Sequence, residues 1–507
     1  MATLPDWLDP LPGAEAMRAI DAWAIEVQSV PSLTLMERAG AGLALAVDGL
    51  ARRGPVAVVC GKGNNGGDGF VAARWLREMR RDVRVLTLAE PHEHRGDAAE
   101  NLRRLDGEHE PFSPAALDGA AVIVDAILGT GFEGEPRGTA LGAIEAIAVH
   151  EALVACADVP SGVDASTGEA AHASVRATST VTFHAAKPAH WIAPGKALRG
   201  ELSVIDIGIP DGAPAGADAG LLTARVHALV PRRGAPSTKF SSGHVVVAGG
   251  SRGLTGAPCL ACEAAMRAGA GYVTALVPGS LELIFETRLL EVMTRALPDE
   301  DGALTPAAAD EALEALGRAG ALVLGLGIGR SESAFAFARE VAARASVPLV
   351  LDADGLNAHA DMPEALAARE ASTVLTPHAA ELGRLLGRSG AEIDRRRLRS
   401  AREVARRAKA VVVLKGDDTI VVAPDGTTAV NDLGAPALAT AGTGDVLAGV
   451  IGALLAKGLE PFAAACAGVR RHAAAGRAAA AIDGPDGVIA RDVIAALPRA
   501  MAGEPGS

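Results

Sequence analysis

Aromatic side chains are scarce: Phe, Trp and Tyr together make up 3% of the 507 residues. Hydrophobic residues nevertheless amount to 49%. The cores must therefore be filled by Ala, Val, Leu and Ile, which is typical of α/β layers built on parallel sheets. A chain of this length exceeds one ordinary core, and we expect two domains. The 59 glycines indicate many tight turns between strands and helices.

Cysteine is also sparse, with five scattered residues in the whole chain. An odd, dispersed set does not predict a disulfide framework. Cys259 and Cys262 form a C-x-x-C in an Ala-rich helical stretch, with no second pair nearby. We interpret them as small buried helix residues rather than as a zinc or redox motif. The reduced cytoplasm is the expected compartment.

Basic residues are outnumbered, 48 Lys and Arg against 61 Asp and Glu, which gives a formal net charge of −13. So acidic a chain is not expected to follow a nucleic-acid backbone. One local exception is the run Arg395, Arg396, Arg397 and Arg399, which we interpret as a solvated helix face.

Long apolar runs are absent as well. The longest, Val446–Ala456, stops at Lys457 and is too short to span a bilayer. Residues 1–12 lack the basic and apolar regions of a signal peptide. We therefore expect no membrane partner.

Strands and helices alternate along both halves of the sequence. In the first half, β-branched runs are separated by helical patterns such as Phe70–Arg80, which predicts a Rossmann-like parallel sheet. The segment Pro210–Gly220 contains only Pro, Gly, Ala and Asp, which is typical of a linker. The expected organisation is a first domain over residues 1–212, a linker over 213–221, a second α/β domain over 222–500 and a disordered tail over 501–507.

The strongest local signal is Gly61–Gly69, with the sequence GKGNNGGDG, between an expected strand and helix. In a parallel sheet this position is the carboxyl edge, where ligands bind. Glycines allow close approach of the backbone to a phosphate, and a helix N-terminus favours an anion. The segment matches G-x-G-x-x-G, which is weak evidence alone. A ligand-free tight turn does not account for Asn64, Asn65 and Asp68 among five glycines.

Two further strand ends carry polar residues. Asp125 is followed by Gly129-Thr130-Gly131, and Asp158 is followed by Ser161. Either Asp alone is more simply a helix N-cap. Three polar strand ends in one sheet, however, converge on one crevice and indicate a binding site.

These motifs, GKGNNGGDG, VDAILGTG and DVPSG, resemble the epimerase domain that interconverts the R and S forms of hydrated NAD(P)H. The resemblance covers Leu11–Ile209. It implies that Asn65, Asp125 and Ser161 hold a potassium ion, a set of one carboxylate and neutral oxygens that suits a hard monovalent cation. Asp158 is the implied acid/base residue. The implied substrate contacts are Asn64, Asn65, Gly66, Gly67, Asp68, Gly129, Thr130, Gly131, Phe132, Glu133, Gly134, Glu135 and Asp158.

In the second half, Thr440–Asp445 precedes a helix expected from Val446. Small residues at a helix N-terminus leave N–H groups free for a phosphoryl group in transfer. Asp445 can accept a proton from a substrate hydroxyl, although the helix dipole alone would also favour an acid there. Lys415 is a candidate phosphate contact, and His378 stands at the carboxyl edge of the expected sheet. The acidic strand end at Asp352–Gly355 either contributes to the site or caps a helix.

This set resembles the ribokinase-like dehydratase domain that restores NAD(P)H from the S-hydrate with ADP or ATP, over Leu222–Leu497. The resemblance implies hydrate contacts from Ala257, Gly327, His378 and Asp445. It implies nucleotide contacts from Lys415, Gly416, Asp417, Asp418, Thr419 and Gly444. Mg²⁺ would accompany the nucleotide phosphates. Asp417 and Asp418 depart from expectation, since carboxylates in this loop repel phosphate or face solvent or a metal. The donor is therefore left open between ADP and ATP.

The expected activity is thus a two-step repair of the hydrates of NADH and NADPH. One alternative is a vitamin or sugar kinase, because GTGD at a helix start also fits that class. Another is a non-catalytic nucleotide-binding module, which would need neither Asp158 nor Asp445. Gly-rich α/β domains commonly associate, so a homo-oligomer is also expected.

Overall fold

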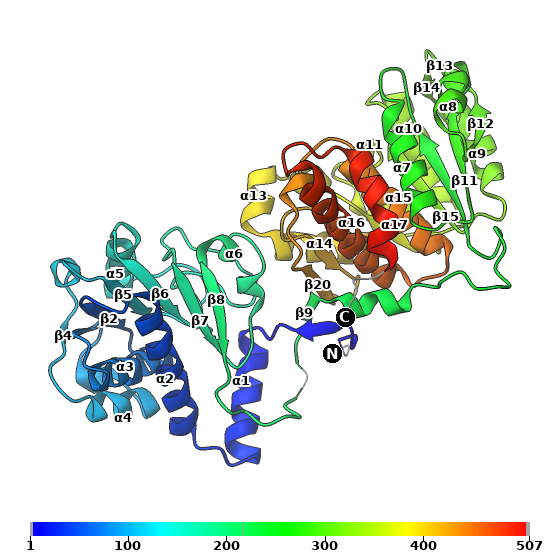
Figure 1. Ribbon diagram of the computed structural model, residues 1–507. Coiled ribbons are helices and arrows are strands. Elements are labelled where there is room, and N and C mark those ends of the chain that lie inside the picture. Colours follow the sequence, from blue (N-terminus) through cyan, green and yellow to red (C-terminus); the bar gives the residue numbers. More distant parts are fainter. Residues whose placement is uncertain (1–3, 215, 503–507) are drawn as a thin grey trace. The chain divides into compact units, whose positions relative to one another are not determined.

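The computed structural model describes residues 4–214 and 216–502, which form two compact units (Figure 1). The first unit comprises Pro10–Gly220. The second comprises Leu4–Asp9 together with the chain from Leu221 onward. The short N-terminal segment therefore belongs with the second unit.

The first unit is built on a seven-stranded sheet in the order β4-β3-β2-β5-β6-β7-β8, and the described pairings are all parallel. Successive strands move outward in both directions from the neighbours β2 and β5, so the sheet has its topological switch point between them. The strands are β2 Val56–Cys60, β3 Val83–Thr87, β4 Glu110–Pro111, β5 Val122–Ala126, β6 Leu153–Ala157, β7 Ser179–Phe183 and β8 Glu201–Ile205.

Helices cover both faces of this sheet, which explains why its central strands are apolar on both sides. Met17, Leu43 and Phe70 of α1, α2 and α3 pack in the core of one face, and Ile144 of α5 packs on the other. The helices are α1 Ala14–Ala22, α2 Ser32–Leu50, α3 Asn64–Glu78, α4 Gly96–Arg104, α5 Gly138–Ala148 and α6 Gly195–Leu198, with a π-helical turn η1 at Trp23–Val27.

The second sheet has eleven strands in the order β1-β9-β20-β19-β18-β17-β16-β15-β10-β11-β12. Its neighbours from β12 to β18 pair in parallel, whereas β18, β19 and β20 pair antiparallel. The strands are β1 Leu8–Pro10, β9 Ala219–Leu222, β10 His244–Gly249, β11 Tyr272–Pro278, β12 Met293–Leu297, β15 Ala321–Leu326, β16 Leu349–Leu351, β17 Thr373–Leu375, β18 Val411–Leu414, β19 Ile420–Val422 and β20 Thr428–Asn431. A separate hairpin joins β13 Asp299–Glu300 and β14 Ala303–Leu304.

The helices α7, α15, α16 and α17 pack together beside this sheet (Figure 1), in a core of small and aliphatic residues such as Ala261, Val446 and Ala464. The helices are α7 Gly256–Arg267, α8 Glu282–Arg288, α9 Ala309–Leu316, α10 Glu332–Arg344, α11 Asp354–Asn357, α12 Ala379–Leu386, α13 Gly390–Arg395, α14 Arg397–Ala408, α15 Thr443–Ala456, α16 Pro461–Asp483 and α17 Ala490–Ala502. The prediction of an α/β protein with parallel sheets is confirmed in both units.

Four expected boundaries differ from the structure. Residues 4–9 group with the second unit rather than with the expected first domain 1–212. Helix α3 begins at Asn64 rather than at Phe70, because the Gly-rich segment itself forms its first turns. The expected linker 213–221 ends inside strand β9, since a strand pairs through its backbone and needs no large side chains. In the expected tail 501–507, residues 501 and 502 complete α17, and 503–507 lie outside the described residues.

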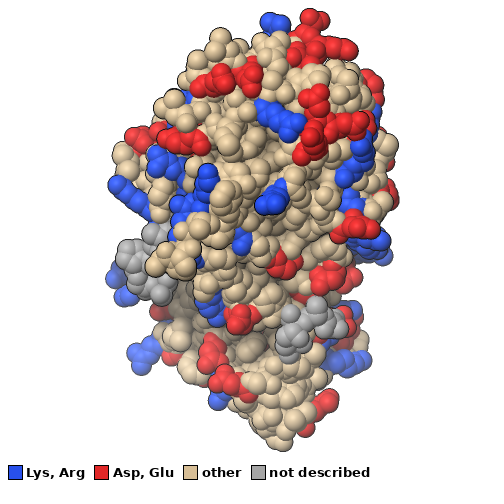
Figure 2. Space-filling model, turned by 90° about the vertical axis from the view of Figure 1, so that its right-hand side faces the viewer, with Lys and Arg blue, Asp and Glu red and all other residues tan. Residues whose placement is uncertain are grey.

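The remaining general expectations concern cysteine, membrane and surface charge. All five cysteines are buried thiols, and Cys259 and Cys262 lie in α7, as interpreted from the sequence. Within the described ranges, the helices fall short of the length and apolarity needed to cross a membrane. Acidic and basic side chains are interspersed on the face drawn in Figure 2.

Candidate active sites

A cavity of about 890 Å³ opens in the first unit beside the ends of β2 and β5, at the switch point of the sheet. Its volume is in the range of small-molecule sites, and its position is where open α/β sheets bind ligands. Polar residues that line it include Asp21, Lys62, Asn64, Asn65, Asp68, Thr130, Glu133, Asp158 and Lys187.

The Gly-rich segment contributes to this cavity through the N-terminus of α3. The helix begins at Asn64, and its N-cap, Gly63, has no side chain to occupy the free N–H groups. Asn64, Asn65 and Asp68 line the cavity. This arrangement of free N–H groups and polar side chains suits an anionic ligand.

Two of the glycines have a packing role instead. A Cβ on Gly66 would overlap the carbonyl oxygen of Gly61, and a Cβ on Gly67 would lie 2.7 Å from Met36 Sδ. Both residues are buried behind the cavity wall rather than on its described lining. The structure therefore explains these glycines by close packing of α3 against its neighbours.

In the segment after β5, some of the expected substrate contacts line the cavity and others do not. Gly129, Thr130, Gly131, Phe132 and Glu133 line the cavity as expected for substrate contacts.

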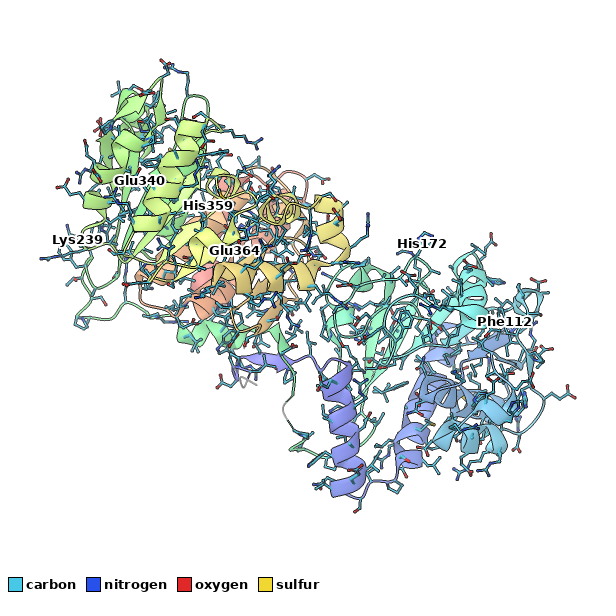
Figure 3. The ribbon with its side chains drawn as sticks, turned by 180° about the vertical axis from the view of Figure 1, so that it is seen from behind. Phe112, His172, Lys239, Glu340, His359 and Glu364 are labelled. Atoms are coloured by element: carbon cyan, nitrogen blue, oxygen red, sulfur yellow. The ribbon has the colours of Figure 1, made fainter. Side chains whose placement is uncertain are left out.

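Gly134 and Glu135 stand outside the described lining. The Glu135 carboxylate instead accepts a hydrogen bond from the backbone N–H of His172, at 3.0 Å (His172 is labelled in Figure 3).

Asn65 lines the cavity, and Leu128 links it by hydrogen bonds to the buried pair Asp125 and Ser161. Asp125 and Ser161 are fully buried. The Ser161 hydroxyl lies 2.6 Å from Asp125 Oδ1, and its backbone N–H donates to Asp125 Oδ2 at 2.8 Å. Asn65 donates to the Leu128 carbonyl at 3.0 Å, while the Leu128 N–H donates to Ser161 Oγ at 2.9 Å. Three expected metal ligands from three separate segments are thus brought to one place.

The chemistry of this cluster fits a monovalent cation. It offers one carboxylate and several neutral oxygens, the donors that hard cations prefer. Burial raises the pKa of Asp125, although hydrogen bonds from Ser161, Cys156 and Ile127 partly oppose the shift. A cation beside this carboxylate would offset the cost of burying its charge.

Asp158, the acid/base residue implied by the family resemblance, is held in an ion pair. It directly follows β6 and has a φ of 65°, a conformation that non-glycine residues rarely adopt. Lys187 Nζ donates to Asp158 Oδ1 at 2.5 Å, and Thr182 Oγ1 donates at 2.9 Å. Thr130 hydrogen-bonds to Oδ2, and His190 Nε2 donates to the Asp158 carbonyl at 2.9 Å.

This network decides the charge of Asp158. Burial alone would raise its pKa, but the Lys187 charge and the hydrogen bonds from Lys187 and Thr130 outweigh burial and lower the pKa to about 2. Asp158 is therefore an anion at neutral pH. Burial, together with the nearby Asp158, raises the pKa of Asp68 well above its usual range.

Lys187 and Asp21 were not identified from the sequence. Lys187 is 1% exposed and lies in the connection after β7, where no local motif marks it. Once β7 is assigned, its position after the carboxyl end of a parallel strand indicates that Lys187 is a candidate site residue. Asp21 lies in α1, and burial is the main reason that its pKa is raised to about 6. No local motif distinguishes Asp21.

In the second unit, charged side chains gather at the carboxyl ends of β16 and β18 and at the start of α12. Lys415 Nζ lies 2.9 Å from Asp352 Oδ1 and 3.8 Å from Glu381 Oε2. A Cβ on Gly444, in the first turn of α15, would lie 3.4 Å from the same Nζ. The structure thus brings Lys415 and Gly444 together, as the sequence predicts. It also places Asp352 in the site rather than only at a helix cap.

Asp445 stands in the first turn of α15, next to this group. Its pKa is raised to about 7, mainly by burial and then by the charges of Asp352 and Glu381, against which Lys415 acts in the opposite sense. A carboxylate with such a pKa is suited to accept a proton near neutral pH. The preceding Gly442 has a φ of 91°, which glycine adopts without strain.

His378 is the N-cap of α12. Its Nδ1 accepts hydrogen bonds from the backbone N–H groups of Ala380 and Glu381, at 3.1 and 3.3 Å. The ring is half exposed, with Nε2 3.5 Å from Glu381 Oε1. Because Nδ1 is an acceptor, Nε2 is the nitrogen that carries the proton and can donate to a ligand.

Ala257 and Gly327 adjoin each other near the start of α7. Gly327 has a φ of 63°, and a Cβ placed on it would lie 2.6 Å from the Leu254 carbonyl oxygen and 3.5 Å from Ala257 Cβ. Ser251 Oγ donates to the Gly327 carbonyl at 2.9 Å. The two residues expected to contact the hydrate therefore form one small patch.

One interpretation from the sequence is wrong. Arg397 is not part of a solvated helix face, since it is 5% exposed and pairs with Asp418. Arg395, Arg396 and Arg399 are exposed, as expected. Charge composition alone could not separate Arg397 from its neighbours, because its partner lies 21 residues away.

Both units are similar to known proteins. A family model described as NAD(P)H-hydrate dehydratase matches residues 245–499, and a model described as YjeF-related protein N-terminus matches residues 32–189. The chain is 40% identical to the bifunctional NAD(P)H-hydrate repair enzyme Nnr of Moorella thermoacetica, over 96% of this chain and 95% of that protein. It is 37% identical to the Nnr of Salinibacter ruber, over 97% and 96%.

A third relative, the Nnr of Escherichia coli, is 35% identical over 87% of this chain and 84% of that protein. Among solved structures, the chain is similar to an ADP/ATP-dependent NAD(P)H-hydrate dehydratase from Bacillus subtilis co-crystallised with ATP and Mg²⁺. That similarity has 29% identity and a TM-score of 0.47, and it covers 56% of this chain and 97% of the other.

Proposed function

The chain belongs to the family of bifunctional NAD(P)H-hydrate repair enzymes, and on that premise we propose how its two units divide the work. The first unit epimerises the R and S hydrates of NADH and NADPH. The second dehydrates the S form at the expense of ADP or ATP. The observation that carries this division is the presence of two separate acidic centres. Asp158 is paired with Lys187 at the cavity of the first unit, and Asp445 stands at the start of α15 in the second unit, which also holds the Lys415–Asp352 pair.

Epimerisation requires a bond at the hydroxyl-bearing carbon, next to the ring nitrogen, to break and reform. Asp158 remains an anion and stabilises positive charge that develops on the ring when that bond breaks. Lys187 holds the Asp158 carboxylate in place through its 2.5 Å hydrogen bond. Asp68 lines the same cavity, and its raised pKa favours the protonated carboxyl, which donates to the hydroxyl oxygen. The C–O bond breaks and water leaves, and water then adds to the opposite face of the ring and returns the proton to Asp68.

The proposed potassium ligands are Asn65, Asp125 and Ser161. When bound, potassium would supply a fixed positive charge beside Asp125. These three residues contact Leu128, directly or through each other. They thereby order the following cavity segment, 129–133.

Dehydration begins with removal of a proton from the hydrate hydroxyl by Asp445. The oxygen forms a bond to the terminal phosphorus of the nucleotide, and the bond from that phosphorus to the bridging oxygen breaks, which leaves AMP or ADP. The backbone N–H groups over Gly442–Gly444 stabilise the charge on the phosphoryl oxygens. The C–O bond of the phosphorylated hydrate then breaks with help from the ring nitrogen lone pair and releases inorganic phosphate. Loss of a proton from the neighbouring carbon restores the double bond.

The second unit also fits a nucleotide that arrives with Mg²⁺. Within the described residues, no group of three His, Cys, Asp or Glu side chains is arranged to hold a metal ion. Mg²⁺ is commonly held by one or two carboxylates together with substrate phosphates, and Asp352 and Glu381 provide such carboxylates beside Lys415. Bound Mg²⁺ would neutralise part of the phosphate charge.

The test supplies a mixture of R and S NADH hydrate with ADP or ATP and follows the recovery of NADH absorbance. We expect complete recovery, because the epimerase converts the R form as the S form is consumed. Recovery of only the S fraction would contradict the epimerase assignment. A parallel reaction supplies ATP with a vitamin or a sugar in place of the hydrate. Phosphorylation of that acceptor, with no recovery of NADH in the first reaction, would establish the kinase alternative instead.

A further inference from the structure

Arg397 of α14 contacts the connection between β18 and β19, residues 415–419, through its guanidinium group. Arg397 Nε donates to Asp418 Oδ2 at 3.0 Å, and its NH2 nitrogen lies 3.0 Å from Asp418 Oδ1. The same NH2 nitrogen donates to the Lys415 carbonyl at 3.2 Å, and NH1 donates to Asp394 at 3.1 Å. The planar guanidinium thus contacts both ends of the connection at once.

The guanidinium of Arg397 and the carboxylate of Asp418 lie close to the backbone of Gly416. A Cβ on Gly416 would overlap Arg397 NH2 and would lie 2.9 Å from Asp418 Oδ1. A side chain at position 416 would displace the guanidinium from Asp418, so glycine at this position allows the ion pair to approach the backbone. The remaining turn is closed by Thr419, whose Oγ1 donates to the Gly416 carbonyl at 2.7 Å.

The pair also explains how a carboxylate is tolerated in a loop that should bind phosphate. The Asp418 side chain is 4% exposed and is paired bidentately with Arg397, whose side chain is 6% exposed. Its charge is thus compensated within the protein. The ammonium group of Lys415 is not paired with Asp418 but lies close to Asp352 and Glu381.

Other arginines of α14 are placed differently. Arg407 pairs with Glu364, whose position is labelled in Figure 3, and these side chains are 30% and 57% exposed. Arg406 is exposed. Only a buried guanidinium facing the loop can fix its shape, because exposed pairs contribute little.

We propose that Arg397 is a positioning residue, which uses its fork to Asp418 and Lys415 to hold residues 415–419 in the shape that binds the nucleotide. The inference rests on the proposed nucleotide site of the second unit. A loop held in its bound shape loses less conformational entropy on binding, so affinity for the nucleotide is higher. Arg397 makes none of the hydrate contacts, so affinity for the hydrate does not depend on it.

The first test is Arg397→Lys, which keeps the charge and loses the bidentate fork. We expect the KM for the nucleotide to rise about tenfold, the effect of losing one charge-assisted hydrogen bond. The KM for the hydrate and the rate of R/S exchange should stay within about twofold of the wild type. Arg406→Gln, on the exposed side of the same helix, is the matched control and should change neither KM.

The second test separates positioning from stability. The double variant Arg397→Met, Asp418→Leu replaces the buried ion pair with apolar side chains, which commonly preserves folding stability. We expect the thermal midpoint of the double variant to be close to that of the wild type. Its KM for the nucleotide should stay as high as that of Arg397→Lys. A purely structural role would restore both quantities together, and that result would overturn the proposal.

Calorimetric titration of each variant with ADP and Mg²⁺ provides a readout that does not depend on turnover. A weaker affinity in Arg397→Lys than in Arg406→Gln supports the proposal even if no hydrate is dehydrated, a case in which only the proposed function fails. Equal affinities in those two variants overturn the proposal. An equal rise in the KM for the hydrate and for the nucleotide also overturns it, because the effect would then be general.

Discussion

Asp158 of the first unit and Asp445 of the second are the same residue type in similar positions, beside the carboxyl edge of a parallel sheet. Burial pushes the pKa of each carboxyl group upward. The outcomes are nevertheless opposite, with a pKa of about 2 for Asp158 and about 7 for Asp445. Because burial acts in the same direction on both carboxyl groups, the difference between their pKa values comes from the neighbouring charges and hydrogen bonds.

The neighbouring lysines account for the contrast. Lys187 is 1% exposed and donates directly to Asp158. Lys415 is instead hydrogen-bonded to Asp352 and close to Glu381, so it acts on Asp445 only from a greater distance. One centre therefore holds a stable anion, and the other holds a base that titrates near neutral pH.

The largest expected effect is that of Asp445→Asn. Removal of the base should slow dehydration by about 10² to 10⁴-fold, the range that a general base commonly contributes. Exchange between the R and S hydrates should continue at the wild-type rate. The measurement follows NADH absorbance from pure S-hydrate and, separately, the R/S ratio by chromatography. Normal dehydration by this variant would show that the catalytic assignment is wrong.

Asp158→Asn should have the next largest effect, on the other unit alone. The change removes the anion and leaves Lys187 buried without its carboxylate partner, so epimerisation should fall by about 10² to 10³-fold, the effect of losing one electrostatic contact to the transition state. Dehydration of pure S-hydrate should be unchanged. With a mixture of R and S hydrates, recovery of NADH should proceed quickly to the S fraction and then slowly. A thermal melt of the variant checks that the first unit remains folded.

The pH dependence of the two activities should differ in the same way. Asp445 must be deprotonated to act as a base, and its pKa is raised to about 7 by burial, Asp352 and Glu381. Dehydration should therefore fall by about tenfold for each pH unit below 7 and level off above it. Asp158 titrates near pH 2 and predicts no such decrease in epimerisation. Initial rates at several pH values and constant ionic strength give both profiles.

Asp352→Asn should lower the pKa of Asp445 and so bring it nearer to the low pKa of Asp158. The change removes a neighbouring negative charge and frees Lys415 from its strongest partner, and both effects lower the pKa of Asp445. The acid limb of the dehydration profile should move to lower pH by about one unit. An unmoved limb would mean that Asp445 does not sense the charge of Asp352.

The smallest expected effect comes from replacing potassium. Substituting tetramethylammonium for potassium at equal ionic strength should slow epimerisation severalfold, since that ion is too large for the cluster of Asn65, Asp125 and Ser161. Dehydration should not respond. Asp125→Asn, which removes the only carboxylate of the cluster, should abolish the difference between the two salts. An equal response of both activities would indicate a general salt effect.

Much of each site follows from local sequence. The glycine-rich segment, Asp125, Asp158 and Asp445 stand next to strand ends or helix starts, and alternation of strands and helices is enough to bring such positions to one edge of a sheet. Lys187 was missed because it stands in a connection without a motif of its own, and only the fold brings it to Asp158. Arg397 was misinterpreted because its burial depends on Asp418, which is far along the chain.

By itself, the sequence determined the α/β class, the order of strands and helices, and the polar residues that follow them, because these depend on short-range patterns of apolar side chains and glycine. Only the tertiary structure decided which cation faces which carboxylate. Lys187 and Lys415 differ little as residues in a sequence, yet one neutralises Asp158 and the other leaves Asp445 free to accept a proton. The physical reason is that electrostatic interactions in a folded protein depend on distance and burial, and neither is encoded in any local pattern.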